Sequence, residues 1–84
     1  MWDQVAAKRL GSAIRARRSE AKLSQEALAH QAGITKNQLQ LLEAGRSTGR
    51  ADASGPSSPR LSTLTGLANV FGVSVSELLI DANL

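Results

Sequence analysis

The chain contains no cysteine, so it can form neither a disulfide framework nor a thiolate metal site. Its single histidine, His30, has no second candidate ligand, and we expect a surface or half-buried side chain there rather than a metal site. The sequence also lacks a glycine-rich phosphate loop and a cluster of carboxylates. No catalytic constellation can be assembled from the remaining residues, so we expect a protein that is not an enzyme and has no cofactor.

Long hydrophobic runs are also missing. No apolar stretch approaches the length of a membrane span or a signal-peptide core, which predicts an intracellular protein with no membrane partner. No stretch alternates strictly between apolar and polar residues, so strands are not expected. The 84 residues, 42% of them apolar, leave room for one all-α domain, residues 1–84, with a modest core.

The first predicted helix runs from about Asp3 to Ala21. Its apolar stripe is predicted at Val5, Leu10, Ile14 and Ala21. Positive charge concentrates on the same segment, at Lys8, Arg9, Arg15, Arg17, Arg18 and Lys22. With a formal charge of +3 and a pI near 10.2, this cluster suits a polyanionic partner, although a solvated helix face explains it equally well on its own.

Residues 25–43 contain two short predicted helices joined by a tight turn at Gly33. Ser24 caps the first, and Thr35 caps the second in a capping box with Gln38. Ala29 falls where the helices would cross, and a bulky side chain there would keep their axes apart. Glycine at position 33 supplies the left-handed residue that ends a helix. This is the pattern of a helix-turn-helix, whose second helix lies in the DNA major groove.

The composition changes after Gly45. Residues Arg46–Pro59 carry no large apolar side chain, which predicts a long flexible loop between the third and fourth helices. Ser58–Pro59 then predicts a cap followed by proline at the first position of the fourth helix. The apolar stripe of that helix is expected at Leu61, Leu64, Leu67, Ala68 and Phe71. A second capping box, Ser74 with Glu77, predicts a short fifth helix.

These segments together resemble the phage repressor and Cro family of helix-turn-helix regulators, also called the xenobiotic response element family. The matching stretches are residues 10–18, 23–29, 33–35, 42–45, 59–68 and 72–79. The resemblance implies a five-helix repressor-like domain that binds double-stranded DNA. It further implies a bacterial or phage transcriptional regulator, more often a repressor than an activator, located in the cytoplasm at the nucleoid. The long loop departs from the family pattern, as does Leu41, a position often polar in the best-known relatives.

Helix geometry indicates which residues would contact DNA. With Leu39 and Leu42 in the core, the outward face of the third helix carries Lys36, Asn37, Gln40 and Leu41, and these are the predicted base-reading residues. Asn37 can pair with adenine, Lys36 with guanine or with a phosphate group, and Leu41 can touch a thymine methyl group, whereas Gln40 could read a base or be solvated. The predicted DNA-backbone contacts, partly implied by the resemblance, are Gln25, Thr35, Arg46, Arg60 and, if the loop orders on DNA, Arg50.

Other expectations concern structure and partners. Arg18 and Glu43 match a pair that forms a partly buried structural salt bridge in relatives. Trp2 is expected to pack against the helical core. A homodimer is expected through the C-terminal region, around Val73, Val75, Leu79, Ile80 and Leu84. The alternative function is an antitoxin or another protein-interaction module on the same fold, with an unknown protein partner.

Overall fold

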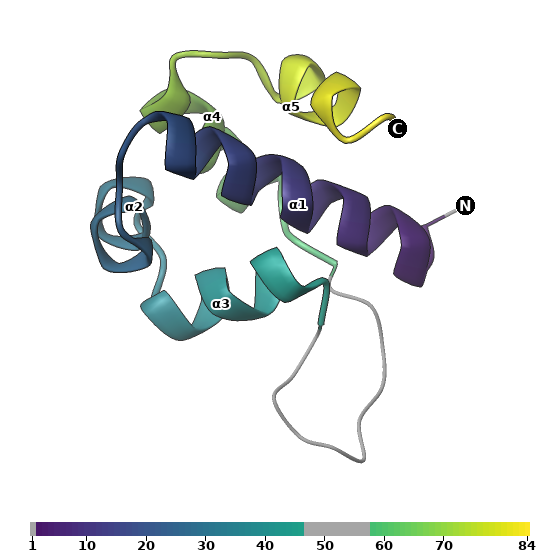
Figure 1. The fold of residues 1–84 in the computed structure, drawn as a ribbon, viewed down its shortest axis with the longest axis horizontal. Coiled ribbons are helices and arrows are strands. Elements are labelled where there is room, and N and C mark those ends of the chain that lie inside the picture. The colour runs from purple at the N-terminus through teal and green to yellow at the C-terminus, as the bar shows by residue number, and fades with distance from the viewer. Residues whose placement is uncertain (1, 47–57) are drawn as a thin grey trace.

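The computed structural model describes residues 2–46 and 58–84, and Figure 1 shows the arrangement of their helices. The helices are α1 (Gln4–Glu20), α2 (Gln25–Ala32), α3 (Lys36–Ala44), α4 (Leu61–Phe71) and α5 (Val75–Asp81). No strand occurs within these two described stretches, so the predicted all-α class is confirmed. Most of the predicted Arg46–Pro59 loop, Arg50 included, lies outside the described residues.

Side-chain caps fix where most helices begin. Asp3, Ser24 and Thr35 accept hydrogen bonds from main-chain N–H groups in the first turns of α1, α2 and α3. The capping box of Ser74 and Glu77 opens α5 as predicted. The predicted start of α4 was wrong, because the helix begins at Leu61 with Arg60 as its cap residue and no side-chain cap bond.

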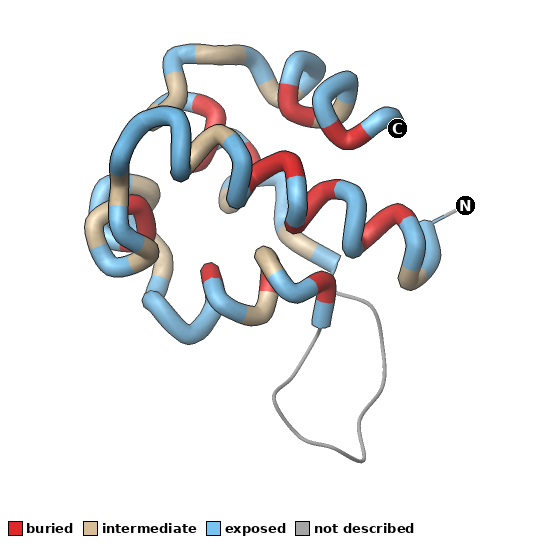
Figure 2. Tube along the Cα trace, viewed as in Figure 1, coloured by how far each residue is buried: buried red, intermediate tan, exposed pale blue. Residues whose placement is uncertain are grey.

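The helices enclose a single hydrophobic core. Its fully buried side chains are Leu10 and Ile14 of α1, Leu28 of α2, Leu39 of α3, Leu67 of α4 and Leu78 of α5. Figure 2 shows the buried segments turned toward the interior from every helix. Each helix contributes to one cluster, in which α3 packs mainly against α1 and α2.

The core differs from the sequence prediction at several positions. Val5 is 57% exposed because it is five positions from Leu10, a rotation of about 140° around the helix. Ala21 is exposed because α1 ends at Glu20 and Ala21 is its C-cap residue. The buried face of α1 instead contains Ala6, Ala7, Leu10, Gly11, Ala13 and Ile14. Leu61, at the outer end of α4, is 70% exposed. Trp2 is 38% exposed and is not one of the core residues.

Two glycines allow helices to cross closely. A Cβ atom on Gly11 would lie 2.5 Å from the carbonyl oxygen of Leu42, where α1 crosses α3. A Cβ atom on Gly66 would lie 2.6 Å from the carbonyl oxygen of Ala32, where α4 crosses α2. Both distances are far below an ordinary van der Waals contact, so these positions need glycine. From the sequence, a close helix approach is predicted at Ala29 and at neither of these glycines.

Within the described ranges, no single helix is long and apolar enough to cross a membrane. Only α4 and α5 taken together reach the required length and composition, and they are bent by 88° at their junction.

Candidate nucleic-acid interface

The turn between α2 and α3 has the geometry that the sequence predicts. Gly33 has φ +77°, a left-handed conformation that glycine adopts without steric cost. The N–H of the next residue, Ile34, donates to the carbonyl oxygen of Ala29 at 3.0 Å and closes the end of α2. Ala29 is 2% exposed, so its small side chain is buried in the core beside this turn. The two helices are therefore joined by a tight, hydrogen-bonded turn and packed on one core.

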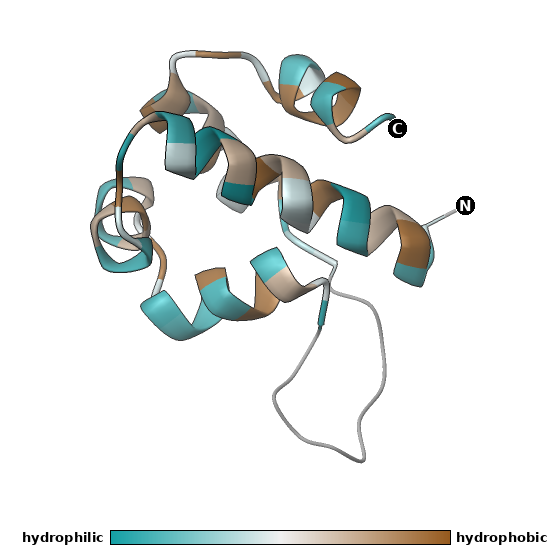
Figure 3. Ribbon diagram, viewed as in Figure 1, coloured by the Kyte–Doolittle hydropathy of each residue, from teal (hydrophilic) through white to brown (hydrophobic). Residues whose placement is uncertain are grey.

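The outer face of α3 is polar and exposed. Leu39 and Leu42 are buried on the inner face, and Lys36, Asn37 and Gln40 are all exposed. Figure 3 shows the hydrophilic side of α3 facing away from the other helices. Thr35 Oγ1 accepts from the Gln38 N–H at 3.0 Å, and Gln38 Oε1 accepts from the Thr35 N–H at 2.8 Å. This capping box uses the Gln38 amide and leaves the Thr35 hydroxyl hydrogen available to an acceptor.

Leu41 is less accessible than predicted. It is half-buried, because its position on the helix lies between the inner face and the outer face. It lines a groove of about 550 Å³ between α3 and the start of α4. Arg46 and Arg60 line the same groove, so two predicted backbone-contacting residues lie together beside α3. Half-buried Pro59 also lines it, outside the helix that it was expected to open.

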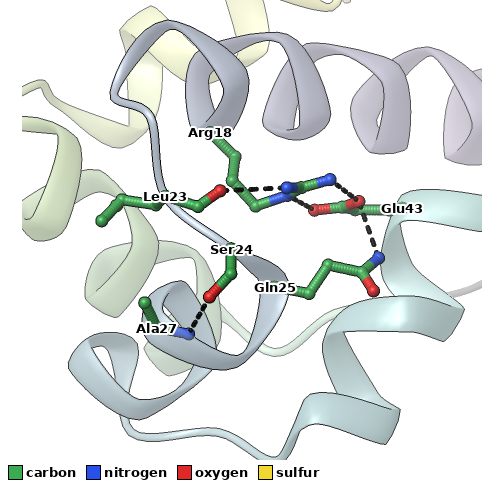
Figure 4. Close-up of polar contacts among 6 residues, drawn as sticks. All are labelled: Arg18, Leu23, Ser24, Gln25, Ala27 and Glu43. Carbon is green, nitrogen blue, oxygen red and sulfur yellow. Dashed lines mark hydrogen bonds and ion pairs between the residues drawn. The ribbon is translucent and has the colours of Figure 1, made fainter.

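The predicted ion pair between α1 and α3 is present and is almost covered. Arg18 Nε lies 2.7 Å from Glu43 Oε2, and the side chains of the two residues are 16% and 4% exposed (Figure 4). A second guanidinium nitrogen donates to Glu43 Oε1 at 3.1 Å, and the third donates to the carbonyl oxygen of Leu23 at 3.0 Å. The hydrogen bond to Glu43 raises the pKa of Arg18, although burial opposes this shift.

Gln25 joins this ion pair. Its Nε2 donates to Glu43 Oε1 at 3.0 Å from the first turn of α2. A hollow of about 340 Å³ lies at the same junction of helices, and its walls are formed by Arg15, Arg18, Gln25, Gln40, Glu43 and Ala44. The sequence alone indicates neither Arg15 as a site residue nor a contact between Gln25 and Glu43. The Gln25–Glu43 contact arises where α2 packs against α3, and Arg15 is brought to it by the crossing of α1 and α3.

The basic residues of α1 do not form a single surface. Arg17 is paired with Asp81 of α5, and this hydrogen bond raises the pKa of Arg17. Arg9 lines a different groove, between α1 and α5, and Lys8 lies against Gly45. The prediction of one cationic cluster on the first helix was therefore too simple. Arg15, beside Gln25 and Gln40, is the exposed α1 cation that adjoins α3 through the hollow.

Comparison with known proteins identifies the family to which this helical domain belongs. The family profile described as a helix-turn-helix domain matches residues 9–79. The chain belongs to this family of helix-turn-helix domains, its repressor-like architecture is that of the phage repressor and Cro type, and its class is that of DNA-binding transcriptional regulators. No curated protein sequence matches the chain.

Solved structures of three regulators are similar. The clp gene regulator ClgR from Corynebacterium glutamicum has a TM-score of 0.76 and 24% identity over 93% of this chain and 72% of its own. The restriction-modification controller protein C.AhdI from Aeromonas hydrophila has a TM-score of 0.70 and 25% identity, covering 86% and 94%. SinR, a master regulator for biofilm formation solved in complex with DNA, has a TM-score of 0.65 and 28% identity, covering 83% and 97%.

Proposed function

We propose that the chain is one domain that binds a specific double-stranded DNA sequence by placing α3 in the major groove. One observation carries this proposal: Lys36, Asn37 and Gln40 are exposed together on a helix that is capped at its start and anchored in the core by two leucines. A rigid polar helix face of this size fits the width of the major groove.

The proposed base contacts follow from side-chain chemistry. Asn37 is suited to adenine, where its amide can pair with N6 and N7, and Lys36 is suited to guanine O6 and N7. Gln40 lies further along the same exposed face. Leu41 has a smaller proposed role, in which its accessible part touches a thymine methyl group. Each good bidentate contact would discriminate between bases by about 1–3 kcal/mol.

The proposed backbone contacts surround α3. Arg46 and Arg60 flank its groove on one side, and Arg15 lies beside the hollow near Gln25. At the start of α2, the Ser24 hydroxyl oxygen accepts from the Ala27 N–H. The main-chain N–H groups of the two residues that precede Ala27 have no acceptor within the helix. Such a helix start favours a phosphate group, and the Thr35 hydroxyl of α3 can add a further bond. Arg50 lies outside the described residues and remains a sequence-based candidate.

The test is selection of preferred sites from random duplexes, followed by titrations at several salt concentrations. We expect one short preferred site whose affinity falls steeply with salt. Lys36→Ala and Asn37→Ala should each relax the preference at one base position, whereas Arg60→Ala should weaken all sequences alike. Weak binding that is equal for every sequence would contradict the proposal and favour a protein-recognition module.

We further propose that two copies bind together on a site with two-fold symmetry, since one recognition helix reads only a few base pairs. The apolar side chains that could pair the copies are fewer than the sequence suggested. Val73, Val75 and Leu79 pack against the core, whereas Ile80 is 71% and Leu84 is 47% exposed. Val5, which is 57% exposed, lines a groove between α1 and α5 and extends the proposed surface onto α1. We propose that such binding represses transcription from the bound promoter, and that the protein acts in the cytoplasm at the nucleoid.

A further inference from the structure

The end of α3 packs against the N-terminal part of α1. Gly45, the C-cap residue of α3, is buried and left-handed at φ +70°. A Cβ atom built on Gly45 would lie 2.9 Å from Lys8 Cγ and 3.0 Å from Lys8 Cα. Gln4 and Lys8 are four residues apart and share one face of α1, so both lie where the chain leaves α3.

The peptide group that joins Gly45 to Arg46 is hydrogen-bonded at both of its polar atoms. The Arg46 N–H donates to the carbonyl oxygen of Leu41 at 2.9 Å, a bond that closes the end of the helix. The Gly45 carbonyl oxygen accepts from Gln4 Nε2 at 2.8 Å. The first bond is local to α3, whereas the second ties this peptide group to another helix.

Gln4 is not needed to cap its own helix. Asp3 is the cap of α1, and its carboxylate accepts from the Ala6 N–H at 2.9 Å. Half-buried Gln4 is the first residue of α1, and its side chain reaches a residue 41 positions further along the chain. The last carbonyl groups of a helix have no donor within it, so Gln4 satisfies a carbonyl oxygen that α3 cannot.

Arg46 directly follows this peptide group. It is exposed and lines the groove beside α3 together with Arg60. A main chain that is ordered before binding loses less entropy when an arginine meets a phosphate group. We propose that Gln4 is a positioning residue for DNA binding, which holds the Gly45–Arg46 peptide group so that Arg46 is directed at the phosphate backbone.

This inference rests on the proposed function and adds to it a residue of α1 that does not itself touch DNA. Gln4 acts through Arg46, so its contribution should disappear when the arginine side chain is absent. A residue that only stabilised the fold would contribute equally with and without Arg46.

Titrations of the wild type, Gln4→Met, Arg46→Ala and the double variant against one preferred and one unrelated duplex test this difference. Methionine is similar in length to glutamine and cannot donate a hydrogen bond. We expect Gln4→Met to weaken both duplexes about threefold, since a phosphate contact carries no sequence preference. In the Arg46→Ala background the same change should have no further effect. Unchanged affinity in Gln4→Met, or equal losses in the two backgrounds, would overturn the proposal.

Gln31→Met is the matched control. It makes the same substitution at an exposed residue of α2, outside the groove that Arg46 lines. This variant should bind both duplexes as the wild type does. A threefold loss here as well would assign the effect to the substitution rather than to the contact with Gly45.

Nuclear magnetic resonance relaxation of the proteins without DNA gives a second readout. In Gln4→Met the order parameter of the Arg46 amide should fall, while those of Lys36 and Asn37 at the other end of α3 should stay. Gln4→Asn keeps the amide but is one methylene too short, so it should behave in the same way. An Arg46 amide as rigid as in the wild type refutes the positioning role.

The same experiments separate this inference from the proposed function. If the wild type prefers no duplex, the proposed function itself fails. If the wild type binds selectively and Gln4→Met binds equally well, only the role of Gln4 is refuted.

Discussion

Two arginines adjacent in the sequence have different roles because α1 presents them to different partners. Arg18 is covered between α1 and α3 and makes bonds from all three guanidinium nitrogens. Arg17 pairs with Asp81 at the surface, with side chains 27% and 31% exposed. Solvent screens the second pair, whereas the first is stabilised by its geometry and would leave an uncompensated charge if broken.

This contrast predicts unequal effects on stability. Glu43→Gln should lower the free energy of unfolding by about 2–3 kcal/mol, because Arg18 would remain partly desolvated without a counter-charge. Asp81→Asn should have a much smaller effect, and that effect should shrink as salt is added. Urea denaturation at two salt concentrations measures both. Equal losses for the two variants would show that burial does not distinguish the pairs.

At the scale of helices, glycine residues set how closely two helices can approach each other. Gly11→Ala would gain about 1 kcal/mol of intrinsic helix propensity, but its Cβ atom would meet the main chain of Leu42 and Glu43. Because those are backbone atoms in a packed helix, they cannot move aside cheaply. We expect Gly11→Ala to lower the unfolding free energy by about 1–3 kcal/mol in thermal melts.

The matched control is the next residue. Ser12 is exposed on α1, so Ser12→Ala should be neutral or slightly stabilising through helix propensity alone. If Gly11→Ala were as stable as Ser12→Ala, the crossing of α1 and α3 would have to be looser than the structure shows.

The start of α4 predicts opposite changes in stability and binding. Arg60 is the cap residue but makes no side-chain cap bond. Arg60→Ser would supply a hydroxyl acceptor and should raise the unfolding free energy by about 0.5–1 kcal/mol. The same change removes a proposed phosphate contact, so affinity should fall for all DNA sequences and the salt dependence should decrease by about one counterion.

Arg60→Ala separates the two effects, since it removes the charge without providing a cap. It should bind DNA as weakly as Arg60→Ser and be less stable. A serine variant with undiminished DNA affinity would place Arg60 outside the interface.

At the scale of the whole molecule, the exposed apolar residues are distributed unevenly. Ile80 and Leu84 lie at the C-terminal end of the fold, and Val5 lies across the α1–α5 groove. Leu61 is as exposed as Ile80, but it lies at the start of α4, beside the groove that Arg60 lines. Ile80 and Leu61 are therefore a matched pair for testing which surface joins two copies.

Ile80→Gln should shift the monomer–dimer equilibrium toward monomer and weaken binding to a palindromic site more than to a single half-site. Sedimentation velocity and titrations of both duplexes measure this. Leu61→Gln, with 70% exposure against 71% for Ile80, should leave the association unchanged. If the two variants associate alike, the dimer surface lies elsewhere.

Local signals in the sequence were sufficient for the helix-turn-helix and for every helix start except that of α4. Caps at Ser24, Thr35 and Ser74 and the left-handed Gly33 act within a few residues, so they can be read without tertiary structure. The fourth helix was misplaced by two residues because the Ser58–Pro59 signal competes with the packing of Pro59 beside α3. The Arg18–Glu43 pair was found through resemblance, since no local rule connects residues on different helices.

The sequence by itself therefore determined which segments are helical, where the turn lies and which polar residues share a face of α3, because these depend on short-range sterics and on helix periodicity. Only the tertiary structure decided that Gly11 and Gly66 bring helices together, that Leu41 is half-buried and that the basic residues of α1 separate onto different surfaces. It also joined Gln25 to Glu43, and the reason is common to all these cases: such contacts depend on how helices cross, which side-chain volumes and the main chain set together.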